Sequence, residues 1–349
     1  MRIGVTNVQV PFVKGGAEVH ADNLVSQLQA RGFEAELITI PFKWYPPERL
    51  LESIAIARML DLSESNGMRI DRLIGLKFPI YLAPHPDKVL WILHQYRSAY
   101  DLWDHPEHGD LINLPQGQAV RAAVHHADKR FLPEATAIYA NSRNVADRLK
   151  RYNGIAATPL YHPPSGAERF RSAPALDYFF FPSRITPLKR QNLVIEALAR
   201  CREPVRVVFA GTAEVLSYMA ELLERCREVG LGDRAVFKGF TSDAEKLDLY
   251  AESLGIIYPP VDEDYGYVTL EAMLSRKPVI TTNDSGGPLE FVEHERTGLI
   301  CAPDATQLAA RMDELWRDRS IASRMGEAGR GYYDALGISW DNVVEVLTA

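Results

Sequence analysis

The 349-residue chain lacks the features that mark secreted, membrane-spanning or repetitive proteins. Its three cysteines, Cys201, Cys226 and Cys301, are far apart without metal-ligand spacing, so we expect reduced, partly buried thiols in a cytosolic protein. The sequence has no run of about 18 apolar residues that would span a bilayer and no secretory h-region. It also has no fixed-period repeat or low-complexity tract. These absences are typical of a soluble globular protein.

The chain also lacks a concentrated basic face. Its net charge is −7; residues 1–165 carry 18 Lys and Arg against 17 Asp and Glu, and residues 166–349 carry 21 against 29. This distribution does not resemble a nucleic-acid footprint. The local cationic excess over 120–151 is typical of the solvated faces of two helices. Its alternative is weak contact with an anionic membrane surface or a phosphorylated acceptor.

What the chain does have is an alternation of strand-like and helix-like segments, which is typical of parallel α/β sheets. We expect strands at 3–8, 34–40, 72–74, 89–94, 137–140, 178–181, 205–210, 235–237, 255–258 and 279–281. In the second half we expect helices near 190–201, 213–229, 243–252, 268–276, 305–318 and 320–334. The length suits two domains, each with its own core.

A shift to Pro, Ser, Gly and Ala between 158 and 176 indicates a linker. We therefore expect a first domain over 1–165 and a second over 170–337. The C-terminal helix 338–349 is expected to pack back onto the first domain. The segment 100–118 is expected to form a long loop.

The most informative stretch is 259–273, in which Glu263 and Glu271 flank a turn-like segment that leads into a helix. Carboxylates only accept hydrogen bonds, so the pair suits a ligand rich in hydroxyl donors. The positive end of the helix dipole between them suits a ligand that also carries negative charge. A sugar joined to a nucleoside diphosphate has both properties.

A second motif is Ser183-Arg184-Ile185-Thr186-Pro187-Leu188-Lys189-Arg190-Gln191-Asn192. Arg184 closes an expected strand and Lys189 opens an expected helix, so both cations project from the carboxyl edge of the sheet, where open α/β sheets bind ligands. Together they are suited to neutralise a diphosphate. The alternative is surface charge that caps a helix.

Two glycine pairs, Gly15-Gly16 and Gly286-Gly287, each precede a helix and allow backbone amides to approach a ligand closely. Neither belongs to a G-x-G-x-x-G motif, which counts against a nicotinamide or flavin enzyme.

His94 ends an expected strand and is suited to bind a sugar hydroxyl; its alternative is a structural histidine. The Asp262-Glu263-Asp264 run superficially resembles a metal clamp, but the cations above already supply charge neutralisation, so we expect no metal.

In this order the motifs resemble those of glycosyltransferase family 4 (glycosyl transferases group 1), retaining enzymes with the GT-B fold. The matching segments are Gly15-Gly16-Ala17-Glu18, Ala140-Asn141-Ser142, Arg184 with Lys189, Phe209-Ala210-Gly211, Phe237-Lys238-Gly239-Phe240, Glu263 to Glu271, Leu270-Glu271-Ala272-Met273, Lys277-Pro278-Val279-Ile280-Thr281, Gly286-Gly287 and Thr297-Gly298-Leu299. The match is nearly continuous over 178–335 and sparse over 1–165. It implies an α/β protein of two Rossmann-like parallel-sheet domains facing an interdomain cleft, the first binding acceptor and the second donor.

The resemblance also implies roles for single residues. Arg184 and Lys189 would hold the donor diphosphate, Glu271 the ribose hydroxyls and Glu263 the sugar hydroxyls; catalysis would rest on Glu263, Arg184, Lys189 and His94. The remaining donor contacts would come from Gly16, Gly239, Phe240, Tyr265, Gly266 and Tyr267. Two positions depart from the family pattern: Asp264 stands where Gly is usual, and His162-Pro163-Pro164 where Asn-Gly is usual.

The activity implied is retaining transfer of a hexose from a UDP- or GDP-sugar to a hydroxyl of a saccharide, glycolipid or polysaccharide precursor. No metal or other cofactor is implied, and the location would be cytoplasmic or peripheral at the inner membrane face. One alternative is a nucleotide-sugar epimerase, which needs no acceptor. The other is a non-catalytic subunit that binds a nucleotide sugar.

Overall fold

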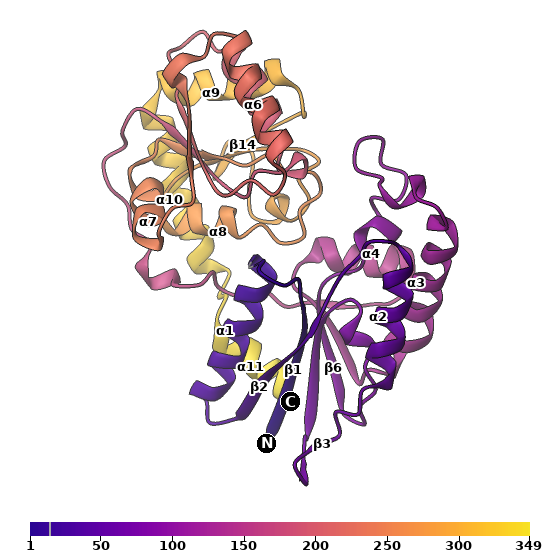
Figure 1. The fold of residues 1–349 in the computed structure, drawn as a ribbon. Coiled ribbons are helices and arrows are strands. Elements are labelled where there is room, and N and C mark those ends of the chain that lie inside the picture. Colours follow the sequence, from indigo (N-terminus) through magenta and orange to yellow (C-terminus); the bar gives the residue numbers. More distant parts are fainter. Residues whose placement is uncertain (14) are drawn as a thin grey trace. The chain divides into compact units, whose positions relative to one another are not determined.

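The computed structural model describes residues 1–13 and 15–349. Contacts within the chain divide it into a first unit, Met1–Ser165 with Ser339–Ala349, and a second unit, Gly166–Ile338. Each unit is a parallel sheet covered by helices (Figure 1). Within the described ranges, no helix combines the length and the apolar character that a membrane span requires.

The first unit is built on a six-stranded sheet of order β2-β1-β5-β6-β7-β8, with every neighbouring pair parallel. Its strands are β1 (Arg2–Gln9), β2 (Glu34–Pro41), β5 (Arg72–Lys77), β6 (Lys88–His94), β7 (Ala137–Ala140) and β8 (Thr158–Pro159). The hairpin of β3 (Glu64–Ser65) and β4 (Met68–Arg69) stands apart from the sheet. The helices are α1 (Gly16–Ala30), α2 (Glu48–Met59), α3 (Gly117–Phe131), α4 (Arg143–Asn153) and α11 (Trp340–Thr348).

Strand β6 is buried along almost its whole length, as expected of a central strand covered on both faces. Because successive side chains point to opposite faces, alternate residues of β6 serve two different cores. Leu90 belongs to the core that contains Val120 of α3. Trp91 belongs to the core that contains Leu24 of α1 and Val344 of α11. The last helix of the chain therefore completes a core of the first unit.

The second unit contains a six-stranded parallel sheet of order β11-β10-β9-β12-β13-β14. Its strands are β9 (Phe179–Pro182), β10 (Val207–Ala210), β11 (Ala235–Gly239), β12 (Gly255–Ile257), β13 (Val279–Thr282) and β14 (Gly298–Cys301). Its helices are α5 (Gln191–Arg200), α6 (Leu216–Glu228), α7 (Asp243–Glu252), α8 (Tyr267–Leu274), α9 (Ala305–Arg317) and α10 (Arg319–Ala335). Counted along the chain, the order is 3-2-1-4-5-6, so the direction of strand addition reverses between β9 and β12. Open α/β sheets bind ligands beside such a reversal, at the carboxyl ends of the strands.

The predicted α/β class is confirmed, and each expected strand overlaps an observed one. The elements that were not expected include α2, the hairpin β3–β4, β8 and β14. Thr158–Pro159 lies in the segment expected to be a linker, yet it forms the edge strand β8 beside β7. Gly298–Cys301 was noted only as a motif and forms β14 beside β13. A strand of two residues, such as β8, is too short to show the alternation on which a strand prediction depends.

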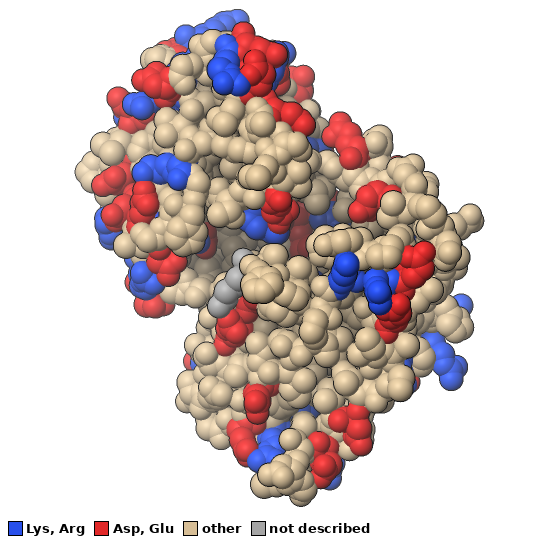
Figure 2. Space-filling view, in the orientation of Figure 1, with Lys and Arg blue, Asp and Glu red and all other residues tan. Residues whose placement is uncertain are grey.

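The cationic excess over 120–151 lies on α3 and α4, but not all of it faces solvent. Arg148 is only 5% exposed, and Arg121 donates to the carbonyl of Ala99 at 3.0 Å. On the face drawn in Figure 2, Lys and Arg are interspersed with Asp and Glu. Mixed signs of this kind are those of an ordinary protein surface on the face drawn.

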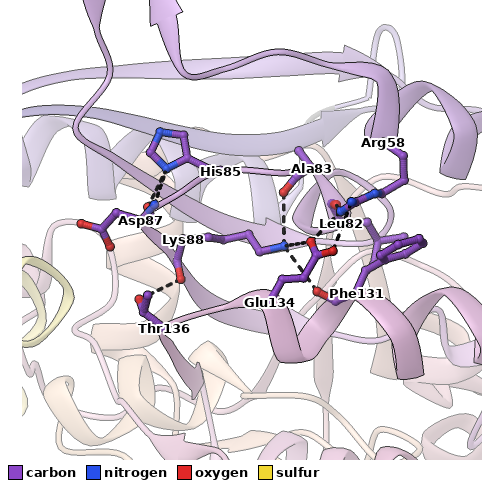
Figure 3. A network of polar contacts seen from close by, with 9 residues as sticks. All are labelled: Arg58, Leu82, Ala83, His85, Asp87, Lys88, Phe131, Glu134 and Thr136. Atoms are coloured by element: carbon purple, nitrogen blue, oxygen red, sulfur yellow. Dashed lines mark hydrogen bonds and ion pairs between the residues drawn. The ribbon is translucent and has the colours of Figure 1, made fainter.

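A charged network closes the amino end of β6 (Figure 3). The fully buried Lys88 donates to the carbonyls of Ala83 (3.2 Å) and Phe131 (3.4 Å) and to the carboxylate of Glu134 (3.3 Å). Arg58 donates to the same carboxylate at 2.7 Å. A cavity of about 430 Å³ beside the network is lined by Arg58, Leu60, Asp61, Ser63, Pro84, His85, Pro86 and Glu134. Because both cations already share Glu134, we interpret the network as a structural tie between α2, β6 and the end of α3.

Candidate functional site

Three loops meet at the carboxyl edge of the second sheet. They follow β9, β12 and β13, which are neighbours beside the reversal of strand order. Backbone hydrogen bonds join them: Val261 N–H to Leu188 O (2.8 Å), Asp262 N–H to Asp284 O (2.9 Å), Glu263 N–H to Ser285 O (2.9 Å) and Gly287 N–H to Glu263 O (2.7 Å). The loop after β12 is therefore held between the other two loops. Its backbone fixes the positions from which its side chains extend.

Lys189 and Glu263 meet where these loops join. Lys189 does not open the helix, as the sequence suggested; it ends a short 3-10 turn, Pro187–Lys189, and α5 begins at Gln191. Its ammonium donates to the carboxylate of Glu263 and, at 3.0 Å, to the hydroxyl of Tyr258. The Lys189 and Glu263 side chains are 13% and 23% exposed. The pair is thus largely withdrawn from water but still accessible to a ligand.

Tyr258 is the central residue that sequence reasoning missed. It is 2% exposed and directly follows β12. Burial raises the pKa of its hydroxyl well above the usual value, and the neighbouring Glu263 adds to this rise. The hydroxyl therefore stays protonated. Arg184 lowers that pKa and Glu271 raises it, so both side chains also act on Tyr258. A tyrosine at the carboxyl end of a buried strand beside the reversal was the available signal.

Arg184 is separate from the Lys189–Glu263 pair. Its side chain is 48% exposed and forms an ion pair with Glu214. The neighbouring Arg190 binds Asp284 through two hydrogen bonds of 2.8 and 2.7 Å. Burial alone raises the pKa of Asp284, but the hydrogen bonds from Arg190 and Thr282 outweigh it and hold that pKa below the usual value. Arg190 therefore ties the loop after β9 to the loop after β13, a role the sequence did not indicate.

Glu271 is the fifth residue of α8 and is 6% exposed. One carboxylate oxygen accepts from the ammonium of Lys246 at 2.5 Å, and the other accepts from the hydroxyl of Tyr250 at 2.6 Å. Both partners lie on α7 and were not singled out from the sequence. The two predicted carboxylates, Glu263 and Glu271, thus have different cationic partners.

The segment between these glutamates forms a rigid corner. Gly266 precedes α8 with φ of +81°, and a Cβ there would lie 2.9 Å from Pro288. Tyr265 is buried and packs edge-to-face on Tyr267, with ring centroids 5.2 Å apart, and on Phe291 at 5.8 Å. Burial raises the pKa of Tyr267 above its usual value. The positive φ of Gly266 and the packed rings therefore fix the backbone where α8 begins.

Two further donor-site predictions lie at the end of β11. Gly239 has φ of +69°, and its carbonyl accepts from Gly211 at 2.8 Å. Phe240 follows it and is 81% exposed. An exposed aromatic ring of this kind is suited to stack on a nucleobase.

The other two predicted residues belong to the first unit. Gly16 is exposed and begins α1; the preceding Gly15 donates its N–H to the side chain of Glu18 at 2.8 Å. His94 ends β6, and its Nδ1 donates to the carbonyl of Gln95 at 2.6 Å. Both residues lie at carboxyl ends of the first sheet, since the Gly15-Gly16 loop follows β1. Their roles stay predictions.

Residues 168–332 match the family described as "Glycosyl transferases group 1". The second unit carries this family's domain. Human alpha-1,3/1,6-mannosyltransferase ALG2 is 34% identical over 155 residues, which cover 41% of the chain and 37% of ALG2. The O-antigen chain mannosyltransferase C of Escherichia coli is 24% identical over 74% of the chain and 77% of its own length. The chain thus spans well under half of the first of these two relatives.

The fold of the whole chain is also that of solved structures. Anabaena HepE, crystallised with UDP-glucose, superimposes with a TM-score of 0.73 at 18% identity, covering 100% of this chain and 98% of HepE. With two six-stranded parallel sheets, the fold is GT-B, as the resemblance implied. Among residues 1–13 and 15–349 no group of three or more His, Cys, Asp or Glu side chains is arranged to hold a metal ion.

Proposed function

We propose that the protein is a retaining glycosyltransferase that moves a hexose from a nucleoside-diphosphate sugar to a hydroxyl of a saccharide, glycolipid or polysaccharide precursor. The donor would bind at the carboxyl edge of the second sheet. Arg184 and Lys189 would bind the diphosphate, Glu263 the sugar hydroxyls and Glu271 the ribose. The backbone of Tyr265-Gly266-Tyr267 would reach the sugar, and Gly239-Phe240 would flank the base.

The observation that carries this proposal is the contact of Lys189 with both Glu263 and Tyr258 beside the strand-order reversal. A cation next to a carboxylate offers binding groups for a phosphate and for sugar hydroxyls at adjacent points. The start of α8 adds backbone N–H groups and the positive end of the helix dipole. A ligand with both a diphosphate and a hydroxyl-rich ring matches this set.

The proposed mechanism follows from the leaving group. Breaking the anomeric bond builds negative charge on the diphosphate, and Arg184 and Lys189 would stabilise that charge where it develops. The acceptor hydroxyl would enter on the same side as the departing diphosphate, so that the anomeric configuration is retained. These residues would supply the positive charge without a metal. From the resemblance we also assign Gly16 to the phosphates and His94 to the sugar.

The donor sugars that we propose come from the names of two relatives and from the ligand in one solved structure. ALG2 and the O-antigen chain enzyme are both mannosyltransferases by name, whereas HepE was crystallised with UDP-glucose. We therefore propose GDP-mannose and UDP-glucose as the first donors to test. Acceptor choice would lie with the first unit, for which the resemblance is sparse.

The test is a thermal-shift screen of UDP-, GDP- and ADP-sugars, because a ligand that binds only the folded state raises the melting temperature. The best donor is then incubated with saccharide and lipid-linked acceptors, and the anomeric configuration of the product is read by NMR. Transfer with retention supports the proposal. A rearranged sugar without acceptor would indicate an epimerase, and binding without transfer to any acceptor would indicate a non-catalytic subunit.

A further inference from the structure

Lys246 and Tyr250 both donate hydrogen bonds to the carboxylate of Glu271. They are one helical turn apart on α7, and each binds a different oxygen of the Glu271 carboxylate, at 2.5 and 2.6 Å. Residues at positions i and i+4 lie on the same face of a helix. Helix α7 therefore presents a cation and a hydroxyl side by side to a carboxylate on α8.

The two partners differ in what else holds them. Tyr250 is fully buried and packs edge-to-face on Phe170 and Phe180, with ring centroids 5.6 and 5.1 Å apart. Lys246 is 35% exposed, and its ammonium lies 5.8 Å from the centre of the Tyr250 ring. Tyr250 is thus part of the core, whereas Lys246 is the partner that a ligand arriving from solvent would meet.

These two hydrogen bonds leave half of the acceptor positions of the Glu271 carboxylate available. A carboxylate has about four acceptor positions, two on each oxygen. Lys246 and Tyr250 take one position on each oxygen, which leaves one on each for a pair of neighbouring hydroxyls. Without Lys246, the charge of the buried Glu271 would be balanced only by the neutral Tyr250 hydroxyl, which is a costly arrangement.

We propose that Lys246 is a positioning residue that fixes the Glu271 carboxylate for recognition of a vicinal diol, the 2′,3′-hydroxyls of the donor ribose. This inference rests on the proposed function, because it takes the ligand to be a nucleoside diphosphate. It adds a specificity determinant on α7, outside the helix that bears the carboxylate.

The test compares ligands that differ only in the diol. Binding of UDP and GDP and of their 2′,3′-dideoxy counterparts is measured by calorimetry for the wild type, Lys246→Met and Lys246→Arg. Hydrogen bonds to a charged group predict that loss of the diol weakens wild-type binding by about tenfold to hundredfold. In Lys246→Met the ratio of the dideoxy ligand's Kd to that of the ligand with the diol should fall below about threefold. Lys246→Arg should restore most of this ratio. The donor KM should rise in Lys246→Met while kcat changes little.

Lys238→Met is the matched control. Lys238 forms an ion pair with Glu245, the residue before Lys246 on α7, at 2.5 Å. Its loss should leave the diol ratio at the wild-type value. If Lys246→Met weakens both ligand types equally, Lys246 is merely structural and the inference is overturned. An unchanged ratio overturns it as well, while the proposed function stands. If the wild type binds no nucleoside diphosphate, the proposed function falls together with this inference.

Discussion

The ammonium of Lys189 contacts the carboxylate of Glu263, although the two residues are 74 positions apart in the chain. Sequence reasoning gave them separate tasks, the diphosphate for Lys189 and the sugar for Glu263. Their contact means that a change in one alters the charge seen by the other. The hydroxyl of Tyr258, 3.0 Å from the same ammonium, belongs to the same unit.

Glu263→Gln should slow transfer more than it weakens nucleotide binding. The amide keeps the shape of the side chain but removes the charge that contacts Lys189 and that we propose faces the sugar. We expect kcat to fall by about a hundredfold or more, in the range found for single electrostatic groups in active sites. The Kd for the nucleoside diphosphate should change less than about fivefold, since a change of 1 kcal/mol corresponds to roughly that factor.

Steady-state kinetics and calorimetry give the two quantities. Glu327→Gln is the control, because Glu327 pairs with the exposed Arg276 on the surface of the second unit. An unchanged kcat in Glu263→Gln would contradict the proposed role.

Gly287→Ala should impair the donor site through the backbone. A Cβ at Gly287 would lie 2.7 Å from the carbonyl oxygen of Tyr265 and 2.9 Å from that of Asp264. Backbone atoms cannot rotate away, so the loop after β12 must shift. We expect a stability loss of about 1–3 kcal/mol and weaker donor binding, measured by urea unfolding and calorimetry.

Gly331→Ala is the natural comparison for that substitution. Gly331 lies in α10, and a Cβ there meets no atom within 4 Å. Alanine in a helix interior is favoured over glycine by about 1 kcal/mol, so this variant should be as stable as the wild type or more so. Equal behaviour of the two variants would show that the loop contact is unimportant.

Acidification should weaken the first unit through His20 and His162. Their Nδ1 and Nε2 atoms lie 2.9 Å apart, and both residues are 1% exposed. Burial lowers the pKa of His20 to about 3 and that of His162 well below its usual value. The unfolded chain therefore binds more protons than the folded one below about pH 6.5, so stability falls as the pH falls toward 3. Each histidine contributes about 1.4 kcal/mol per pH unit.

The buried Asp128 opposes this trend, so the histidine effect is read as a difference between variants. Burial raises the pKa of Asp128 to about 7, and its contribution to stability is lost as the pH rises from about 4 through 7. His162→Gln should reduce the slope of the unfolding free energy between pH 5 and 6 by about 1.4 kcal/mol per pH unit. The exposed His126→Gln should leave the slope unchanged. Equal slopes in the wild type and His162→Gln would refute the prediction.

Removing the charge of Glu134 should lower the free energy of unfolding more than removing the charge of Lys88 (Figure 3). Burial lowers the pKa of Lys88, and Glu134 acts in the opposite direction. Glu134→Gln leaves a buried ammonium with carbonyl partners alone, at a cost of about 2 kcal/mol; this is below the value for fully buried pairs because Glu134 is 38% exposed. Lys88→Met leaves Glu134 paired with Arg58 and should cost less than about 1 kcal/mol. Urea unfolding decides the order of the two variants, and the reverse order would contradict this interpretation.

The fold was largely predictable because its strands are dense apolar runs. Phe179–Pro182 and Val207–Ala210 are fully buried, and the sequence showed both. The edge strand β8 was missed because it has only two residues, and the segment of β14 was noted only as a motif. The carboxyl edge was also predictable, since strand ends in a parallel sheet share an edge.

The side-chain partnerships within the site could not be predicted. Lys246 and Tyr250 lie in the expected helix 243–252 but were not singled out, and only tertiary packing brings them to Glu271. Arg190 was likewise given no role from the sequence, yet it binds Asp284 at two points. Such partners are set by tertiary packing, which leaves no local pattern in the sequence.

The helix α11 has a consequence for how the protein is made. The second unit, Gly166–Ile338, is one continuous segment, whereas the first needs Ser339–Ala349 to complete its core. During synthesis the second unit can finish folding while the first, begun earlier, still exposes the apolar surface around Leu24 and Trp91. Of the two units, the one that is synthesised first is therefore completed last.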